Sequence, residues 1–249
     1  MSYFKIYKID AISSTNDYLK QLYLKKNIYD NFLIITNNQT EGKGQGSSYW
    51  ESEPKKNLTL SIYKDLKKNK LKNPFIINLI ISISIIETLK KYNLPNLKIK
   101  WPNDILSASK KISGILIENF FQREFLISSI IGIGLNVNTH TRQFPKSIAK
   151  YSISLQSIKG EQIRIHELAA KLIKAILSGY KDCMSKSLEK ELISGWAEVD
   201  ELSGKKIKVH CGKEIFSGKA SGIDKDGNLL LKLRNGRLRK IHGGEIEIL

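Results

Sequence analysis

Three glycines at alternate positions stand in a polar stretch between two predicted strands, in the run Gln39-Thr40-Glu41-Gly42-Lys43-Gly44-Gln45-Gly46. Glycine lets the backbone approach a ligand closely and leaves N–H groups free to surround an anion. Lys43 adds a positive charge to this surface, and Trp50 follows shortly after. The spacing matches neither a Walker loop nor a Rossmann glycine motif. The run therefore predicts an anion-binding loop of another kind, with a plain surface loop as the alternative.

A second candidate is the run Lys100-Trp101-Pro102-Asn103-Asp104 at the end of a short predicted strand. Pro102 ends the strand, and Asn103 and Asp104 then place an amide and a carboxylate at the rim of the sheet. Mg²⁺ prefers oxygen ligands and usually binds through one or two carboxylates plus phosphate, so Asp104 with Lys100 suits a magnesium–phosphate site. The alternative is an ordinary turn, because Pro-Asn-Asp is favourable turn chemistry.

Two further segments combine glycine with apolar strand residues. Lys110 and Lys111 lead into the run Ile112-Ser113-Gly114-Ile115-Leu116-Ile117-Glu118, and a later strand contains Gly132-Ile133-Gly134-Leu135-Asn136. Glycine weakens the interior of a strand, so Gly132 and Gly134 indicate that another backbone or a ligand packs there. For the lysine pair, two solvated side chains before a strand are the alternative.

The elements that must position these segments change character along the chain. Strands are expected over residues 3–9, 32–36, 58–63, 97–101, 112–118 and 125–137. Helices are expected after a Ser14 cap and over residues 75–89, 166–180 and 187–199. From about Glu201, five short strands are separated by Asp226-Gly227 and Asn235-Gly236, which favour hairpin turns. The prediction is an α+β fold, with a mixed β-sheet flanked by helices over residues 1–200 and a small closed β-barrel over residues 201–249.

Composition limits the classes of protein that remain. The chain has 249 residues and a formal net charge of +17, but only six basic residues are Arg. Because the lysines are spread along the chain, they indicate a solvated surface rather than a specific nucleic-acid face. Cys183 and Cys211 cannot form a disulfide framework or a four-ligand zinc site. No signal-peptide core is evident, and the longest apolar run is about half of the roughly 20 residues that span a bilayer. A cytoplasmic protein without a membrane partner is expected.

In their order and spacing, these segments resemble biotin–protein ligases. The resemblance covers nearly the whole chain, and its most specific part is the Lys100 to Asp104 run. It also includes the motifs Ser14-Thr15-Asn16, Asn57-Leu58…Ser61-Ile62 and Lys111…Gly114…Glu118. The last 50 residues resemble that family's small C-terminal barrel. No winged-helix segment precedes Tyr3, so the monofunctional form without a DNA-binding domain is expected.

The resemblance implies a class II synthetase-like catalytic domain and a two-step reaction. Biotin and ATP would form biotinyl-5′-AMP and pyrophosphate with the help of Mg²⁺. The biotinyl group would then pass to one lysine of the biotin carboxyl carrier protein of a carboxylase. Exposed sheet edges in this fold would allow a homodimer.

The resemblance also implies roles for individual residues. Lys111 and Lys43 would be catalytic, and Asp104 would contact Mg²⁺. Biotin would be bound by Ser14, Thr15, Asn16, Gln39, Lys43, Gly44, Gln45, Lys111 and Gly114. ATP would be bound by Lys43, Trp50, Lys100, Asn103 and Asn136. The family's loop commonly reads Gly-Arg-Gly-Arg, whereas here Lys43 lacks a bidentate fork and Gln45 is neutral, so the adenylate is expected to leave more readily.

Two other functions compete with this one. A lipoate- or octanoate-transferring enzyme of the same fold is the nearest, and the Lys100 to Asp104 run and the C-terminal barrel favour biotin over it. A nonenzymatic, basic nucleic-acid-binding module would bind in a salt-sensitive way without ATP turnover. That module leaves the ordered set of motifs unexplained.

Overall fold

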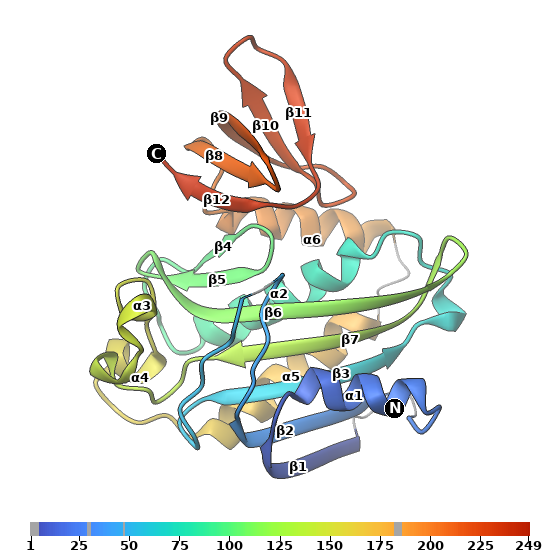
Figure 1. Ribbon diagram of the computed structural model, residues 1–249, viewed down its shortest axis with the longest axis vertical. Helices are drawn as coiled ribbons and strands as arrows, with labels where there is room; N and C mark the ends of the chain where they lie inside the picture. Colours follow the sequence, from blue (N-terminus) through green and yellow to red (C-terminus); the bar gives the residue numbers. More distant parts are fainter. Residues whose placement is uncertain (1–4, 29–30, 47, 182–185) are drawn as a thin grey trace.

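The computed structural model describes residues 5–28, 31–46, 48–181 and 186–249. A seven-stranded sheet forms the centre of the larger unit (Figure 1), and only its β1–β2 pair is parallel. In spatial order its strands are β1 (Lys5–Ile12), β2 (Phe32–Gln39), β3 (Leu58–Asp65), β7 (Phe125–Leu135), β6 (Lys110–Gln122), β5 (Asp104–Ser107) and β4 (Lys98–Lys100). The mixed sheet predicted from the sequence is confirmed.

Helices cover both faces of this sheet. Helix α1 (Thr15–Leu24) lies in front of it in Figure 1, and α2 (Phe75–Lys90) and α5 (Ile165–Lys181) lie behind. Consecutive residues of one strand therefore enter different cores: Ile62 packs in the large cluster on the α2 side, and Tyr63 packs with Leu19 of α1. This alternation is the period of two that a β-strand imposes.

Helix α2 is apolar on nearly every side because it is enclosed. The sheet, α5 and α6 (Lys186–Val199) all contact it, and it buries most of its isoleucines. The expected helix over residues 75–89 is confirmed. None of the helices in the described ranges is long and apolar enough to cross a membrane.

The sequence interpretation did not predict some of the short helices and strands. The strand expected over residues 97–101 is a hairpin, β4–β5, in which Lys100 pairs with Asp104 across a turn with a cis Trp101–Pro102 bond. One or two helical turns are too short to show a periodicity; they form η1 (Lys67–Asn69), η2 (Thr141–Gln143), α3 (Lys146–Ala149) and α4 (Leu155–Lys159). The start of the strand expected over residues 3–9, and Cys183, lie outside the described residues.

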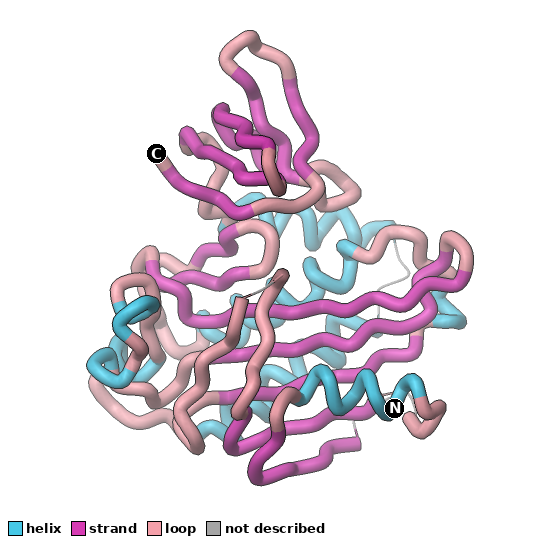
Figure 2. Tube along the Cα trace, viewed as in Figure 1, coloured by secondary structure: helices cyan, strands magenta, loops and turns pink. Residues whose placement is uncertain are grey.

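The last 50 residues form a separate antiparallel sheet of five strands, seen at the top of Figure 2. Their order is β11 (Leu238–Ile241), β10 (Leu229–Leu233), β9 (Glu214–Ile223), β8 (Lys206–Cys211) and β12 (Glu245–Ile248). The five predicted strands are confirmed. Within residues 201–249, β11 and β12 are the two ends of the ladder, so the expected hydrogen-bonded closure of the barrel is not observed.

A turn of this small sheet docks on the larger unit. The Trp101 indole donates a hydrogen bond to the Gly227 carbonyl at 2.9 Å, and the Asn73 amide donates to the Lys225 carbonyl at 2.8 Å. Gly227 has φ +82°, and a Cβ there would overlap the Phe75 ring. The docking turn therefore requires glycine at this position.

Candidate active site

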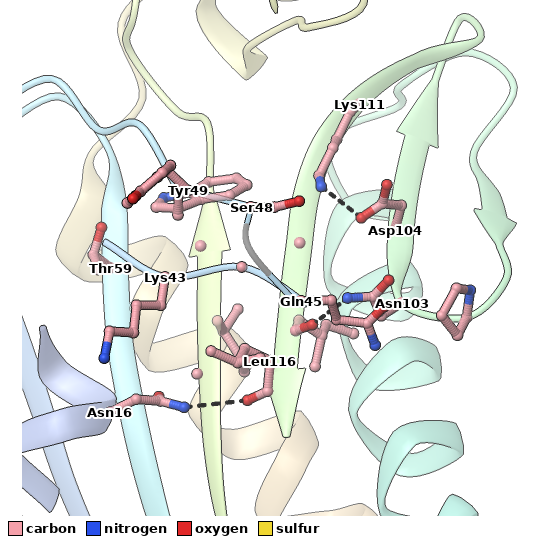
Figure 3. Close-up of a pocket in the computed structure, with 18 of the residues that line it drawn as sticks. Asn16, Lys43, Gln45, Ser48, Tyr49, Thr59, Asn103, Asp104, Lys111 and Leu116 are labelled. Atoms are coloured by element: carbon pink, nitrogen blue, oxygen red, sulfur yellow. Dashed lines mark hydrogen bonds and ion pairs between the residues drawn. The ribbon is translucent and has the colours of Figure 1, made fainter. Parts of the chain in front are cut away.

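A cavity of about 340 Å³ lies above the middle of the large sheet (Figure 3). All but one of the site residues expected from the sequence line it: Ser14, Thr15, Asn16, Gln39, Lys43, Gly44, Gln45, Trp50, Lys100, Asn103, Asp104, Lys111 and Gly114. Segments that are far apart in the chain therefore meet around a single cavity.

One wall of the cavity is polar and uncharged; it consists of Ser14, Thr15, Asn16 and Gln39. The fully buried Ser61 is hydrogen-bonded to Thr15 and Asn16, and the five residues together are called the polar end below. Ser14 caps α1, its hydroxyl accepting the Asp17 N–H at 3.3 Å. The Gln39 side-chain oxygen, at the end of β2, accepts from the Thr15 backbone N–H at 2.9 Å and from its hydroxyl at 3.0 Å. The first turn of α1 is thus held by its Ser14 cap and by Gln39 of β2.

Asn16, also buried, has hydrogen-bond partners on two strands of the sheet. Its Oδ1 accepts from the Ser61 hydroxyl at 2.6 Å, and its Nδ2 donates to Glu118 Oε2 at 3.1 Å. A Cβ on Gly132, on the strand beneath, would overlap Oδ1. The glycine in β7 therefore makes room for a side-chain amide, where the sequence analysis expected a ligand or another backbone.

The opposite wall carries charge; it consists of Trp50, Lys100, Asp104 and Lys111 and is called the charged end. Lys111 Nζ lies 2.6 Å from Asp104 Oδ1, an ion pair across the β5–β6 ladder that Figure 3 shows. The same ammonium group is 5.7 Å from the centroid of the Trp50 ring. An anion bound here would meet a cation that already has one carboxylate partner.

The Trp50 indole packs against two glycines of the sheet. A Cβ on Gly134 would overlap its indole, and a Cβ on Gly114 would lie 3.0 Å from its Cζ3 atom. The Trp50 Nε1–H is buried and has no hydrogen-bond partner among the described residues. Because a buried donor without a partner is costly, this N–H is suited to a ligand acceptor.

Lys43 lines the cavity and forms an ion pair with a carboxylate of α1. Its Nζ lies 2.7 Å from Asp17 Oδ2 on α1, and this hydrogen bond and the Asp17 charge raise the pKa of Lys43. The loop around it is a hairpin in which Trp50 N–H donates to the Gly42 carbonyl at 2.9 Å. Lys43 and Lys111 therefore face opposite ends of the cavity, each beside a carboxylate.

The run from Lys100 to Asp104 is held by three elements. Lys100 Nζ donates to the Ile246 carbonyl of the C-terminal unit at 3.3 Å, and Asn103 Nδ2 donates to the Ile115 carbonyl at 2.6 Å. Asn78 of α2 donates to the Pro102 carbonyl at 2.8 Å. The turn predicted from this run exists, and it also lines the cavity.

Asn136 is the one expected site residue that does not line the cavity. It is buried, and its Nδ2 lies 3.5 Å from the Lys111 carbonyl oxygen. Its backbone N–H donates to the Ile112 carbonyl at 2.8 Å. The structure thus places Asn136 beside β6, the strand that carries Lys111, at the end of β7.

The donor set at the charged end fits a magnesium ion that arrives with phosphate. Among the residues that the structure describes, no three His, Cys, Asp or Glu side chains gather as a metal site. Mg²⁺ usually needs only one or two carboxylates, because water and phosphate oxygens complete its shell. Asp104 and Glu245 are the carboxylates lining this part of the cavity.

Several residues that line the cavity or contact its lining residues had no assigned role in the sequence interpretation. Gly244, Glu245 and Ile246 extend from the C-terminal unit into the cavity wall, and no local pattern signals such a distant contact. Ser61 was visible as a polar residue inside an apolar strand. Asp17 was visible only as part of a capping pattern.

Comparisons with known proteins agree with this geometry. Residues 9–136 match the Biotin/lipoate A/B protein ligase family, and residues 202–249 match the Biotin protein ligase C terminal domain. The chain is 31% identical over 242 residues to the bifunctional ligase/repressor BirA of Escherichia coli, which covers 96% of this chain and 73% of that protein. It is 29% identical over 239 residues to the protein of the same name from Bacillus spizizenii, with 96% and 72% covered. The solved structure of the biotin protein ligase from Aquifex aeolicus in complex with biotin and ATP superposes with a TM-score of 0.83, at 26% identity over 99% of both chains.

Proposed function

The chain belongs to the biotin/lipoate A/B protein ligase family, and we propose that the cavity described above performs both steps of a biotin–protein ligase. The enzyme activates biotin with ATP and passes the biotinyl group to a lysine of a biotin carboxyl carrier protein. This is the activity of a biotin–[acetyl-CoA-carboxylase] ligase. The observation that supports it best is that an uncharged polar wall and a charged wall line the same cavity of about 340 Å³.

The two walls suit the two substrates of the first step. The uncharged donors and acceptors of the polar end match the neutral ureido ring of biotin. The charged end matches the triphosphate, and the unpartnered Trp50 N–H lies on the same side. We assign Ser14, Thr15, Asn16 and Gln39 to biotin, and Trp50, Lys100 and Asn103 to ATP.

In the first step a biotin carboxylate oxygen attacks the α-phosphorus of ATP, and the bond to pyrophosphate breaks. Two anions must approach, so the barrier falls when a fixed cation neutralises them. We assign this role to Lys111, whose ammonium group leaves Asp104 for the forming anhydride or shares its hydrogens between the two. When bound, Mg²⁺ supplies further positive charge to the phosphates, and Asp104 would hold it.

In the second step the amine of the carrier lysine attacks the biotinyl carbonyl carbon, and AMP leaves. The carrier lysine must react as a neutral amine, and the proton released as the amide forms passes to the departing AMP phosphate or to solvent. Water must be kept from the anhydride until then. We assign the glycine-rich loop, with Lys43, Gly44 and Gln45, to covering the intermediate. Lys43 would exchange Asp17 for the adenylate phosphate during this step.

The remaining proposals concern organisation. We propose that residues 1–200 form the substrate-binding unit and residues 201–249 a small unit that completes the ATP side through Gly244 to Ile246. We also propose a cytoplasmic enzyme that forms a homodimer through its sheet edges and binds no specific nucleic acid.

Mass spectrometry of a carrier domain tests the function directly. A biotin carrier domain incubated with this protein, biotin and Mg-ATP should gain one biotinyl group on one lysine. Lipoate and octanoate, supplied in parallel, should give less than about a hundredth of that rate. Equal transfer of lipoate would favour the lipoate-ligase alternative, and no transfer of any acid would contradict both.

A further inference from the structure

Three lysines of the C-terminal unit lie directly opposite one another on β8, β9 and β10, adjacent strands of the small sheet at the top of Figure 1. Lys206 of β8 pairs in register with Lys219 of β9, and Lys219 pairs with Lys232 of β10. Residues that are directly opposite in antiparallel strands share a face of the sheet, so these three side chains form one row, called the lysine row below. All three residues are exposed. They do not line the cavity, and the proposed reaction gives them no role.

The charge of the lysine row is not neutralised within the part of the chain that the structure describes. Elsewhere on the same sheet, Lys208 Nζ lies 3.6 Å from a Glu247 oxygen, and Lys240 Nζ lies 2.7 Å from an Asp224 oxygen. None of the lysines in the row forms such an ion pair with a described residue. Like charges directly opposite each other destabilise a sheet, and an anionic partner would remove this repulsion.

The lysine row shares its face of the small sheet with a residue of the cavity wall. His210 of β8 pairs in register with Glu245, which lines the cavity. His210 and Lys206 are four residues apart on β8, so their side chains share a face and lie about 13 Å apart. A protein domain about 30 Å across, docked over the cavity, would therefore also reach the lysine row.

Aliphatic side chains flank the lysine row on the same face. Leu238 of β11 lies opposite Lys232 and is 57% exposed, and Ile215 of β9 is 59% exposed. Phe216, the one Phe, Tyr or Trp residue of this unit, pairs with Val209 on the other face. Proteins that bind single-stranded nucleic acid usually combine their cations with aromatic stacking. A row of cations between aliphatic side chains instead favours the acidic surface of another protein.

We propose that the lysine row docks an acidic surface of the carrier protein while the target lysine of the carrier enters the cavity. The inference deepens the proposed function and rests on it. The second step brings a protein substrate to the cavity, and the lysine row presents unneutralised cations on the face that carries Glu245. Charges at the edge of an interface act mainly on encounter and on the choice of partner. The row therefore selects an acidic carrier without taking part in the chemistry.

Steady-state biotin transfer measures this docking. The full-length protein is assayed with biotin, Mg-ATP and the biotin carrier domain of the same organism at varied concentration. The row variant is Lys206→Gln/Lys219→Gln/Lys232→Gln. Its matched control is Lys91→Gln/Lys159→Gln/Lys174→Gln, which removes the same charge from exposed lysines of the larger unit. Pyrophosphate release without carrier reports on the first step, and thermal melting reports on folding.

The row variant should raise the KM for the carrier about tenfold, because each exposed ion pair contributes roughly twofold. Its kcat for transfer and its rate of pyrophosphate release should stay within about twofold of wild type, because the row does not touch the reacting groups. The matched control should keep the wild-type KM. Added salt should raise the carrier KM of wild type more than that of the row variant, because salt screens exposed charges.

Other outcomes would overturn the inference. They are an unchanged carrier KM in the row variant, or an equal rise in the matched control, which would assign the effect to net charge alone. A row variant that loses binding to fluorescent poly(U) RNA at an unchanged carrier KM would assign the face to nucleic acid. If the triple variant does not fold, Lys219→Glu reverses the central charge, and its carrier KM should rise about fivefold; an unchanged KM counts against the inference. Wild-type protein that biotinylates no carrier would instead overturn the proposed function.

Discussion

The two ends of the cavity differ in the charge and in the hydrogen bonding of the groups that line them. The polar end is built from buried, uncharged groups whose hydrogen bonds are nearly complete before any ligand arrives. The charged end holds an ion pair of partly exposed groups, Lys111 and Asp104, and a tryptophan N–H without a partner. A rigid, neutral wall suits a substrate part that does not change, and a charged wall suits the part whose charge changes during the reaction.

The largest effect should come from removing the cation of the charged end. Lys111→Ala should lower the rate of pyrophosphate release about 10²- to 10³-fold, because the charge matters most as the anhydride forms. The dissociation constant for biotin, measured by calorimetry, should change less than about fivefold. Lys110→Ala, the exposed neighbour on the same strand, is the matched control and should behave like wild type. Near-normal pyrophosphate release in Lys111→Ala would remove this lysine from the catalytic role.

Two glycines on one strand provide a test that separates the ends. A Cβ on Gly132 would overlap Asn16, and a Cβ on Gly134 would overlap Trp50. Overpacking costs about 1–3 kcal/mol, which corresponds to roughly 5- to 150-fold in affinity. Gly132→Ala should therefore raise the biotin dissociation constant, and Gly134→Ala should raise the KM for ATP. The reverse pattern, or equal effects of both variants on both ligands, would contradict the division of the cavity.

A smaller effect is expected from a substitution in the glycine-rich loop, to which we assign the covering of the intermediate. Gln45→Arg adds a cation beside the phosphate of the adenylate, and a charge-assisted hydrogen bond contributes about 1.5–3 kcal/mol. The off-rate of biotinyl-5′-AMP, followed with labelled biotin, should fall about tenfold. Gln122→Arg adds the same charge on the exposed β6–β7 turn and should leave this rate unchanged. An unaltered off-rate in Gln45→Arg would exclude Gln45 as the cause of any leakage.

The smallest effect concerns the docking turn next to the charged end. Burial opposes ionisation of Asp224, but hydrogen bonds from Lys240 and Asn228 outweigh it and lower its pKa to about 2 from the ordinary 3.8. The stabilisation is therefore complete above about pH 4 and is lost as the pH falls through 2. Asp224→Asn should lower the free energy of unfolding at pH 7 by about 1 kcal/mol, since part of the gain is screened. Denaturant titrations at several pH values should show this difference shrinking below pH 4.

Asp226→Asn, in the same turn, is the control for that experiment and should unfold like wild type. Asp224→Asn should also raise the KM for ATP about twofold without changing biotin binding, because the turn receives the Trp101 indole. A biotin dissociation constant that rises with the ATP value would show that the turn supports both ends equally.

The sequence was most informative where a pattern repeats. The Leu-Ile-Ile content of β2 and the apolar length of α2 predicted a strand and a buried helix, because side chains on both faces of the sheet are covered. The motifs also identified thirteen of the residues that line the cavity. The four-residue strand β5 was read as part of a turn, since Pro-Asn-Asp precedes it and no period fits so short a segment.

The sequence did not predict which side chains form ion pairs inside the site. Lys43 next to Asp17, and Lys111 next to Asp104, depend on which side-chain rotamers the packed loops permit. The contribution of Gly244 to Ile246 depends on how the C-terminal sheet docks, a contact between segments more than 100 residues apart. Local propensity carries no information on either.

The docking of that sheet has a consequence for how the two units can vary. Lys100, Trp101 and Asn73 all donate to main-chain carbonyls of the C-terminal unit, at Ile246, Gly227 and Lys225. Every amino acid supplies a carbonyl, so these contacts place no demand on side-chain identity at Ile246 and Lys225. The docking itself therefore leaves the outer surface of the last fifty residues free to drift during evolution while the turn that carries Asp104 stays in place, and Gly227 is the fixed point.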